Sequence, residues 1–382
     1  MKLLFVGSEI RHELGCAASL ALLGHDVIYF HVGSKYKPVS WRETCLDYAR
    51  LKVKILEIPH PTLFQTLLNI KSLISEAILQ YSPDVVVSTP SVPYYIGKYL
   101  ASLNDVPLIL RVWGVRANKL VEHIVYGKNY LEIIGFIPSI MHMLKQIYSS
   151  RIVITLDNST LKFIKSLTLT CLKRMKLIYP TYAALYEKHS YFTLEAILPE
   201  IAQTEGYILG IVTMSKTGSV FKLEQPLFKI LYMIAKKLKD ISVIVCCGTR
   251  EEAIKKFKVD PPTNMKFIPS GVPDDILKLL YERSLLVVIP VFFKSVSNRL
   301  LEALFYKKPI LTNSIALELH PELRDCVIVS DNYNKYPEII KDLLKQSTIL
   351  EELQQRVKIV WDRFFSSKVQ AREMLKVIKE VI

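Results

Sequence analysis

The sequence predicts an α/β protein built from two doubly wound, parallel-sheet domains. Short apolar runs alternate with longer helical patterns along almost the whole chain, which is typical of β-α-β units. Several of these runs are continuous in valine and isoleucine, which indicates strands that are covered on both faces. The chain has 382 residues, which is enough for two domains of about 100–200 residues each.

The first half of the chain alternates between strand and helix patterns from its beginning. The expected elements are strands at residues 3–6, 27–30, 84–88, 108–112 and 151–155, with a helix at residues 17–23 that ends at Gly24. Ligands of such sheets bind outside the carboxyl ends of the strands. We therefore expect functional residues in the segments that follow these strands.

The pattern is interrupted around residues 180–205, where Pro180 and Pro199 flank a poorly periodic stretch that is typical of a linker. We expect an N-terminal domain at 1–185, a C-terminal domain at 186–355, and a final helix at 356–382 that packs back toward the N-terminal domain. The expected elements after the linker are strands at residues 207–212, 241–247, 265–268, 285–290, 309–312 and 326–329, helices at 225–238, 274–282 and 298–306, and a helical region from Tyr336 onward.

The formal net charge is +14, with a pI near 9.3. Three kinds of partner are compatible with this charge: nucleic acid, an anionic membrane surface and anionic small molecules. The lysines are spread along expected helices, as at residues 235–239, rather than gathered into blocks with aromatic residues between them. This disfavours nucleic acid and favours solvated helix faces, with a basic face for phosphates or lipid headgroups as the alternative.

Neither a zinc site nor a membrane span is expected. None of the six cysteines has C-x-x-C spacing and no histidine cluster accompanies them. Cys246 and Cys247 end an apolar run, as buried thiols in a reducing compartment do. No run reaches 18 apolar residues, and the first residues do not resemble a signal peptide. We expect a cytoplasmic protein, at most peripheral on the inner face of the cell membrane.

The most informative stretch is residues 289–304, in which a buried strand leads through a short polar loop into a helix that contains Glu302. The free N–H groups at a helix N-terminus suit a phosphate. A carboxylate one turn into the helix can accept hydrogen bonds from ribose hydroxyls. Glutamates early in helices also complement the helix dipole routinely, so this pattern alone leaves both interpretations open.

Further motifs accompany this stretch. They are Gly271-Val272-Pro273 followed by Leu277 and Tyr281, Glu302-Ala303, Lys308-Pro309, and Leu20 followed by Gly24-His25 and Val27. Together they resemble the retaining glycosyltransferases of family 4, specifically over 265–313 and moderately elsewhere. The resemblance implies the GT-B architecture, in which two Rossmann-like domains face a cleft. It also implies sugar transfer, with retention, from a nucleoside-diphosphate sugar to a glycan or lipid-linked glycan.

The resemblance assigns the donor to the C-terminal domain and the acceptor to the N-terminal domain. In the donor site, Glu302 would hold the ribose. The other donor-binding residues it implies are the loop residues Ser295, Val296 and Ser297 facing the diphosphate, Gly271 and Val272 against the base, and Lys216 and Lys294. Acceptor or cleft candidates after the first strands are Glu9, Arg11, His12, Trp113 and Gly114. The resemblance implies no cofactor and no metal, and the chain has no Asp-x-Asp motif.

Three departures from the family pattern concern this donor site. Lys294 replaces the first motif glutamate, Ile211 replaces an arginine with Lys216 shifted by one place, and Trp113 replaces a histidine before Gly114. A lysine has only donors, so Lys294 would bind the diphosphate, pair with an acidic sugar, or face solvent. No catalytic residue is predicted.

The departures leave open a catalytically weakened protein. The rival functions are a nucleotide-sugar epimerase, an inverting transferase, and a non-catalytic subunit that binds a nucleotide or partner.

Residues 136–148 place Ile137, Ile140, Met141, Leu144, Ile147 and Tyr148 at helical spacing. A packed helix is one interpretation. A face for a membrane surface or a lipid acceptor, with Lys119, Lys128 and Lys145 nearby, is the other.

Overall fold

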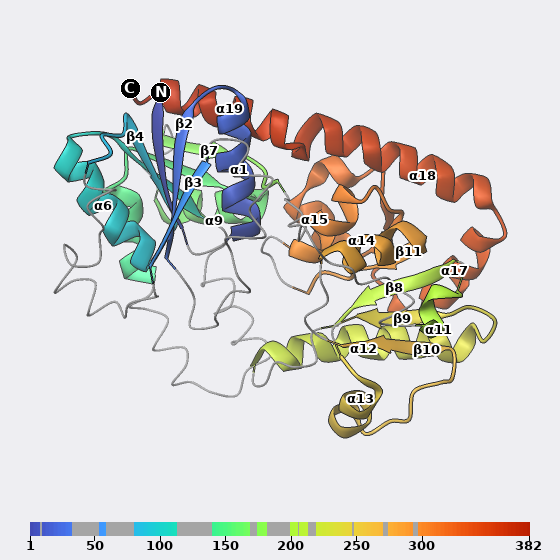
Figure 1. Ribbon diagram of the computed structural model, residues 1–382. Coiled ribbons are helices and arrows are strands. Elements are labelled where there is room, and N and C mark those ends of the chain that lie inside the picture. The colour runs from blue at the N-terminus through green and yellow to red at the C-terminus, as the bar shows by residue number, and fades with distance from the viewer. Residues whose placement is uncertain are drawn as a thin grey trace. The chain divides into compact units, whose positions relative to one another are not determined.

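The computed structural model describes residues 1–7, 10–32, 53–58, 80–112, 140–168, 174–181, 199–204, 206–212, 219–246, 248–269, 274–292 and 297–382 (Figure 1). The chain divides into two compact units. Unit 1 contains the described residues of Met1–Leu185 together with Phe364–Ile382, and unit 2 contains those of Tyr186–Phe292 and Ser297–Arg363.

Unit 1 is built on a parallel seven-stranded sheet with the order β3-β2-β1-β4-β5-β6-β7. Its strands are β1 (Lys2–Gly7), β2 (Asp26–Val32), β3 (Val53–Ile58), β4 (Val85–Ser88), β5 (Leu108–Val112), β6 (Ile152–Thr155) and β7 (Met175–Leu177). The first six follow the Rossmann order 3-2-1-4-5-6, and β7 extends that edge. The strand order therefore reverses between β1 and β4.

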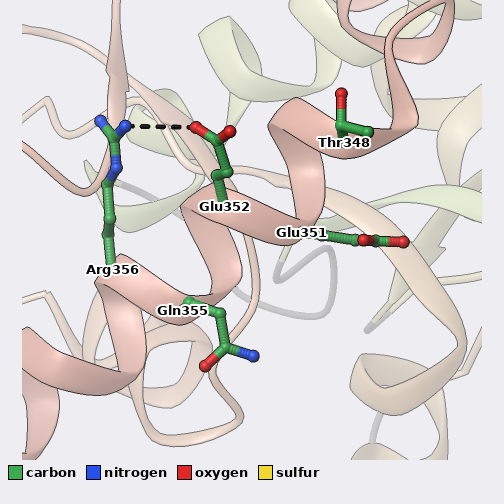
Figure 2. Close-up of a pocket in the computed structure, with 5 residues that line it drawn as sticks. All are labelled: Thr348, Glu351, Glu352, Gln355 and Arg356. Atoms are coloured by element: carbon green, nitrogen blue, oxygen red, sulfur yellow. Dashed lines mark hydrogen bonds and ion pairs between the residues drawn. The ribbon is translucent and has the colours of Figure 1, made fainter.

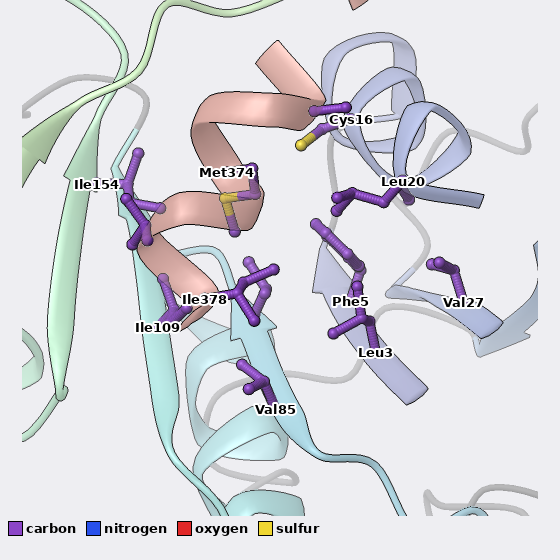
Figure 3. Packing of buried hydrophobic residues seen from close by; sticks show 14 of the residues in the cluster. Leu3, Phe5, Cys16, Leu20, Val27, Val85, Ile109, Ile154, Met374 and Ile378 are labelled. Carbon is purple, nitrogen blue, oxygen red and sulfur yellow. The ribbon is translucent and has the colours of Figure 1, made fainter. Parts of the chain in front are cut away.

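Helices cover both faces of this sheet. One face packs against α1 (Ile10–Leu22) and α19 (Ser367–Lys379), where Leu3, Phe5 and Ile109 meet Met374 and Ile378 (Figure 3). The other face packs against α6 (Val92–Asn104), the helix at residues 140–148, and α9 (Asn158–Leu167). Because α19 is the last helix of the chain, the C-terminus completes the core of the unit that the N-terminus begins.

Unit 2 contains a parallel six-stranded sheet with the order β10-β9-β8-β11-β12-β13. Its strands are β8 (Tyr207–Ile211), β9 (Val243–Cys246), β10 (Met265–Ile268), β11 (Ser284–Val288), β12 (Ile310–Thr312) and β13 (Ile328–Val329). This is again the order 3-2-1-4-5-6, so the reversal lies between β8 and β11.

The helices of unit 2 also lie on both faces of its sheet. On one face Leu231 and its neighbours in α12 pack on β8 and β9. A Cβ at Gly210 would lie 2.3 Å from Leu231 Cδ1, so glycine permits this close approach. On the other face Tyr207 donates a hydrogen bond to Leu280 O in α14. The helices are α11 (Pro199–Ala202), α12 (Ser219–Lys237), α13 (Arg250–Phe257), α14 (Asp274–Arg283), α15 (Asn298–Phe305), α16 (Ser314–Leu319), α17 (Tyr336–Leu344) and α18 (Ser347–Val360).

Local sequence explains where several helices begin and end. Asp157 caps α9 by accepting hydrogen bonds from the Thr160 amide and hydroxyl, both at 2.7 Å. Thr249 and Glu252 form a reciprocal capping box at the start of α13. Single turns of 3₁₀ helix lie at Pro321–Leu323 and Tyr333–Lys335, and a π-helical turn at Trp361–Phe365 joins α18 to α19.

The predicted fold class is confirmed, since both sheets are parallel and covered on both faces. Some elements are not predicted from the sequence. They are the edge strands β3 and β7 and the helices α6, α9, α11, α13 and α16. Helices α1 and α12 begin several residues before their predicted starts. Among the described helices none is long and apolar enough to cross a bilayer.

Candidate functional site

The reversal of strand order between β8 and β11 defines the candidate ligand site of unit 2. Ligands in open parallel sheets bind at such a reversal, outside the carboxyl ends of the strands. Strand β11 ends at Val288, and the chain then reaches Ser297, the residue that precedes α15. Helix α15 is therefore the helix that follows β11, one of the two strands that flank the reversal.

Ser297 starts α15 as its N-cap. Its backbone is extended, and its hydroxyl accepts a hydrogen bond from the Leu300 amide at 3.4 Å. Leu300, Leu301 and Leu304 are fully buried, which fixes the helix against unit 2. The helix N-terminus carries a partial positive charge and amide donors, so it offers a place for an anionic group such as a phosphate.

Asn313 braces the segment that leaves β11. It follows β12, is only 2% exposed, and its carboxamide bonds Val291 twice: Oδ1 accepts from Val291 N at 3.0 Å, and Nδ2 donates to Val291 O at 2.8 Å. Nδ2 also lies 3.1 Å from the Tyr333 hydroxyl. The Asn313 side chain thus supplies the hydrogen bonds that a neighbouring strand would supply within the sheet.

Glu302 lies one turn into α15 and is 8% exposed. Its Oε2 accepts a hydrogen bond from the Tyr281 hydroxyl at 3.2 Å. Tyr281 belongs to α14, is completely buried, and stacks on Tyr306 with ring centroids 4.7 Å apart. A buried carboxylate is costly unless it is hydrogen-bonded, so Tyr281 stabilises Glu302 in the folded protein.

Two lysines follow α15. Lys307 has a left-handed backbone (φ 57°), and its Nζ lies 4.3 Å from the centroid of the Trp361 ring. Burial lowers its pKa to about 8, although Asp362 opposes this change. Lys308 donates to Glu282 O at 3.2 Å, and burial lowers its pKa as well. Both amines make contacts within unit 2. Lys308, the lysine of the Lys-Pro motif, therefore has a structural role.

A polar layer crosses the carboxyl edge of the sheet in unit 1. Gly7 pairs with His31 on β2, and the register of β1, β4 and β5 brings Thr89 and Arg111 level with it. Glu13 of α1 reaches this layer, where its Oε2 accepts from Arg111 Nη1 at 2.7 Å. Both side chains of this ion pair are 2% exposed. The layer spans the reversal between β1 and β4 of unit 1.

The Arg111–Glu13 pair is buried at a cost. Although burial disfavours a charged guanidinium, the Glu13 carboxylate and its hydrogen bond raise the pKa of Arg111. Within the described residues neither Arg111 Nε nor the Thr89 hydroxyl has a hydrogen-bond partner. An unsatisfied buried polar group costs about 1–3 kcal/mol. We therefore expect an apolar layer of the same shape to be at least as stable.

The structure describes part of the predicted site. Ser297 and Glu302 lie on α15, and Arg11 and His12 lie in the first turn of α1, where only the backbone is described. The predicted residues outside the described part are Lys216, Gly271, Val272, Lys294, Ser295, Val296, Glu9, Trp113 and Gly114. Of the six residues in the predicted apolar face, Ile137 is outside the described part and Ile147 is a core residue at 3% exposed. Among the described residues of that face, Ile140 and Leu144 are partly buried, and Met141 and Tyr148 are exposed.

The sequence alone gives no role to Asn313 or Arg111. It identifies Tyr281 only as a motif position, and it predicts a functional role beside the first strand for Glu13 without its ion pair to Arg111. Asn313 after an apolar strand, and a charged residue inside the apolar run of β5, were the available signals.

The described residues contain no group of three or more histidine, cysteine or acidic side chains able to hold a metal ion. A surface hollow of about 630 Å³ lies along α18. Its lining residues are Thr348, Glu351, Glu352, Gln355 and Arg356 (Figure 2). Glu352 and Arg356 form an exposed i,i+4 ion pair at 3.3 Å, as on an ordinary solvated helix face. Ser297 and Glu302, the predicted site residues that the structure describes on or beside α15, do not line this hollow.

No family model and no curated protein matches the sequence. Solved structures match the fold over nearly the whole chain. Anabaena HepE, in complex with UDP and glucose, has a TM-score of 0.66 at 11% identity, with all of both chains covered. Sucrose-phosphate synthase from Thermosynechococcus elongatus has a TM-score of 0.68 at 11% identity, covering 99% of this chain and 98% of that one.

A third similar structure is a putative UDP-N-acetylglucosamine 2-epimerase from Listeria monocytogenes, with a TM-score of 0.60 at 11% identity and coverage of 99% and 96%. At these identities the similarity concerns the fold. The chain has the GT-B fold, with two Rossmann-like units.

Proposed function

We propose that the protein is a glycosyltransferase that moves a sugar from a UDP-sugar to a glycan or lipid-linked glycan. Unit 2 would bind the donor nucleotide and unit 1 the acceptor. One observation carries the proposal: α15 begins at the strand reversal of unit 2 and presents both a helix N-terminus and Glu302. The choice of UDP is supported by HepE, which was solved with UDP-glucose. Retention is proposed from the family resemblance of the sequence.

The two chemical features of α15 suit the two parts of a nucleoside diphosphate. The amides at its N-terminus are donors for the phosphate oxygens. The Glu302 carboxylate is an acceptor for the ribose hydroxyls, and its remaining exposure of 8% lets a ligand reach it. A transferase needs both groups, because the diphosphate is the leaving group and the ribose fixes its position.

Glu302→Ala is expected to weaken UDP binding by about 1.5–3 kcal/mol, since one charged hydrogen-bond partner is lost. Titration calorimetry with UDP measures this change. Glu351→Ala is the matched control, because it removes an exposed glutamate from another helix of unit 2 and is expected to bind UDP normally. Glu302→Gln keeps an oxygen for Tyr281 and guards against misfolding. If both Glu302 variants bind UDP as the wild type does, the ribose role is wrong.

We propose that transfer needs no divalent metal. The N-terminus of α15 and basic side chains can neutralise the charge that develops on the leaving diphosphate. Metal-dependent transferases commonly hold the diphosphate through a metal that acidic side chains bind, whereas the residues assigned here to the diphosphate are amide donors and lysines.

The first alternative is a nucleotide-sugar epimerase, since one similar structure carries that name. An inverting transferase and a non-catalytic nucleotide-binding subunit are further alternatives. The fate of the sugar separates them. Proton NMR of the reaction distinguishes a new α- or β-glycoside, an epimerised UDP-sugar, and an unchanged UDP-sugar.

We further propose that the protein is cytoplasmic and associates peripherally with the inner face of the cell membrane. Met141 and Tyr148 are 62% and 52% exposed on one helix, and Lys145 lies exposed between them in sequence. Lysines contribute about 1 kcal/mol each near anionic lipid.

Vesicles that contain phosphatidylserine are expected to bind the wild type at low salt and to release it at high salt. Met141→Ser combined with Tyr148→Ser is expected to reduce this binding in a flotation assay. Ile359→Ser, at a residue 64% exposed in unit 2, is the control and is expected to bind as the wild type does. Failure of the wild type to float at low salt would instead favour a soluble acceptor.

A further inference from the structure

Tyr281 is placed to act on a ligand only through Glu302. The tyrosine is 0% exposed, so a ligand cannot contact it directly, whereas Glu302 is 8% exposed. The Tyr281 hydroxyl lies 3.2 Å from Glu302 Oε2. This contact joins α14 to α15.

Burial and a stacking contact hold the phenol ring itself. It stacks on Tyr306 at an interplanar angle of 20°, and Tyr306 N donates to Glu302 O at 3.0 Å at the end of α15. The preceding residue, Leu280, accepts a hydrogen bond from Tyr207 on β8 at 2.8 Å. The hydroxyl of Tyr281 is therefore fixed by packing before any ligand binds, and it fixes the carboxylate in turn.

We propose that Tyr281 is a positioning residue for ribose recognition, which holds the Glu302 carboxylate in the rotamer that meets the ribose hydroxyls. A glutamate side chain loses rotamer freedom when it binds a ligand. Orienting one carboxylate oxygen in advance removes part of this cost. This inference rests on the proposed function, because it requires that Glu302 bind ribose.

The matched control is another buried tyrosine that contacts the same helix. Tyr207 is also 0% exposed and also loses one hydroxyl hydrogen bond when changed to phenylalanine, but its partner is the Leu280 carbonyl. A merely structural role of Tyr281 would make Tyr281→Phe and Tyr207→Phe behave alike. With a positioning role, only Tyr281→Phe would reduce the preference for a nucleotide that carries ribose hydroxyls.

The experiment compares UDP with 2′,3′-dideoxy-UDP by titration calorimetry, using the full-length chain. We expect the wild type to prefer UDP. Tyr281→Phe is expected to weaken UDP binding about 5–10-fold and to leave the dideoxy nucleotide unchanged. Tyr207→Phe is expected to keep the wild-type ratio of the two affinities. In a Glu302→Ala background, Tyr281→Phe is expected to cause no further loss, because coupled residues are not additive.

The outcomes separate this inference from the proposed function. If the wild type prefers UDP and Tyr281→Phe keeps that preference, the positioning role is overturned and the ribose role of Glu302 stands. A loss of preference in both tyrosine variants would also overturn it, since the effect would then be a general loss of packing. Equal affinity of the wild type for the two nucleotides would remove the ribose role and the positioning role together.

Discussion

Arg111→Met is expected to destabilise unit 1 by about 3–5 kcal/mol, because it leaves the Glu13 carboxylate buried without its partner. The ion pair is 2.7 Å long and both side chains are 2% exposed, so solvent cannot replace the lost guanidinium. Hydrogen exchange of peptides from α1 and β5, measured across a urea series, reports this loss. Peptides from β9 in unit 2 provide the internal reference.

The double variant Arg111→Met, Glu13→Leu is expected to regain the stability of the wild type, because replacing a buried pair with apolar side chains is often neutral or stabilising. The unpartnered Arg111 Nε strengthens this expectation, since its desolvation cost disappears with the side chain. If the double variant is less stable than the wild type, the pair contributes net stability and the cost assigned to this polar layer is wrong.

Ile378→Ala is expected to cost about 2–5 kcal/mol of stability in unit 1. Ile378 is 0% exposed and belongs, with Met374, to the part of α19 that packs on β1, β5 and α1 (Figure 3). Removing its side chain leaves a cavity in that core. The thermal unfolding midpoint of the full chain measures the effect.

Ile359→Ala is the control for this substitution, because it removes the same atoms from a residue that is 64% exposed on α18. Exposed substitutions of this kind usually change stability by less than about 0.5 kcal/mol. Equal destabilisation by the two variants would show that α19 does not share the core of unit 1.

The central strands could be predicted because their sequences are unambiguous. The runs at β1, β4, β5 and β6 are almost continuously apolar, so each strand places apolar side chains on both faces of the sheet, as a sheet covered on both faces requires. The edge strand β3 does not alternate strictly, because its charged residues Lys54 and Glu57 are three positions apart, and this spacing resembles a helix segment as easily as a strand. The edge strand β7 has only three residues, too few for any pattern.

The candidate site could be predicted only where one segment carries it. Ser297 and Glu302 lie on a single helix, so the sequence places them together. The contacts that hold this site join separate segments, since Tyr281 is 21 residues from Glu302 and Asn313 is 22 from Val291. In the polar layer of unit 1, Arg111 is likewise 98 residues from Glu13. One sequence without a fold carries no signal for such pairs, although a charge inside a buried strand implies that some partner exists.

The central claim is that this chain binds a nucleoside diphosphate sugar, and ligand-induced thermal stabilisation tests it most directly. The thermal unfolding midpoint is measured with uridine, UDP, UDP-glucose and UDP-N-acetylglucosamine, each with and without EDTA. We expect UDP and at least one UDP-sugar to raise the midpoint saturably, with about 2.7 kcal/mol of stabilisation at 100 times Kd, and EDTA to change nothing. Uridine is expected to have little effect because it lacks the phosphates that α15 would bind. If no UDP compound stabilises the protein more than uridine does, the claim is contradicted.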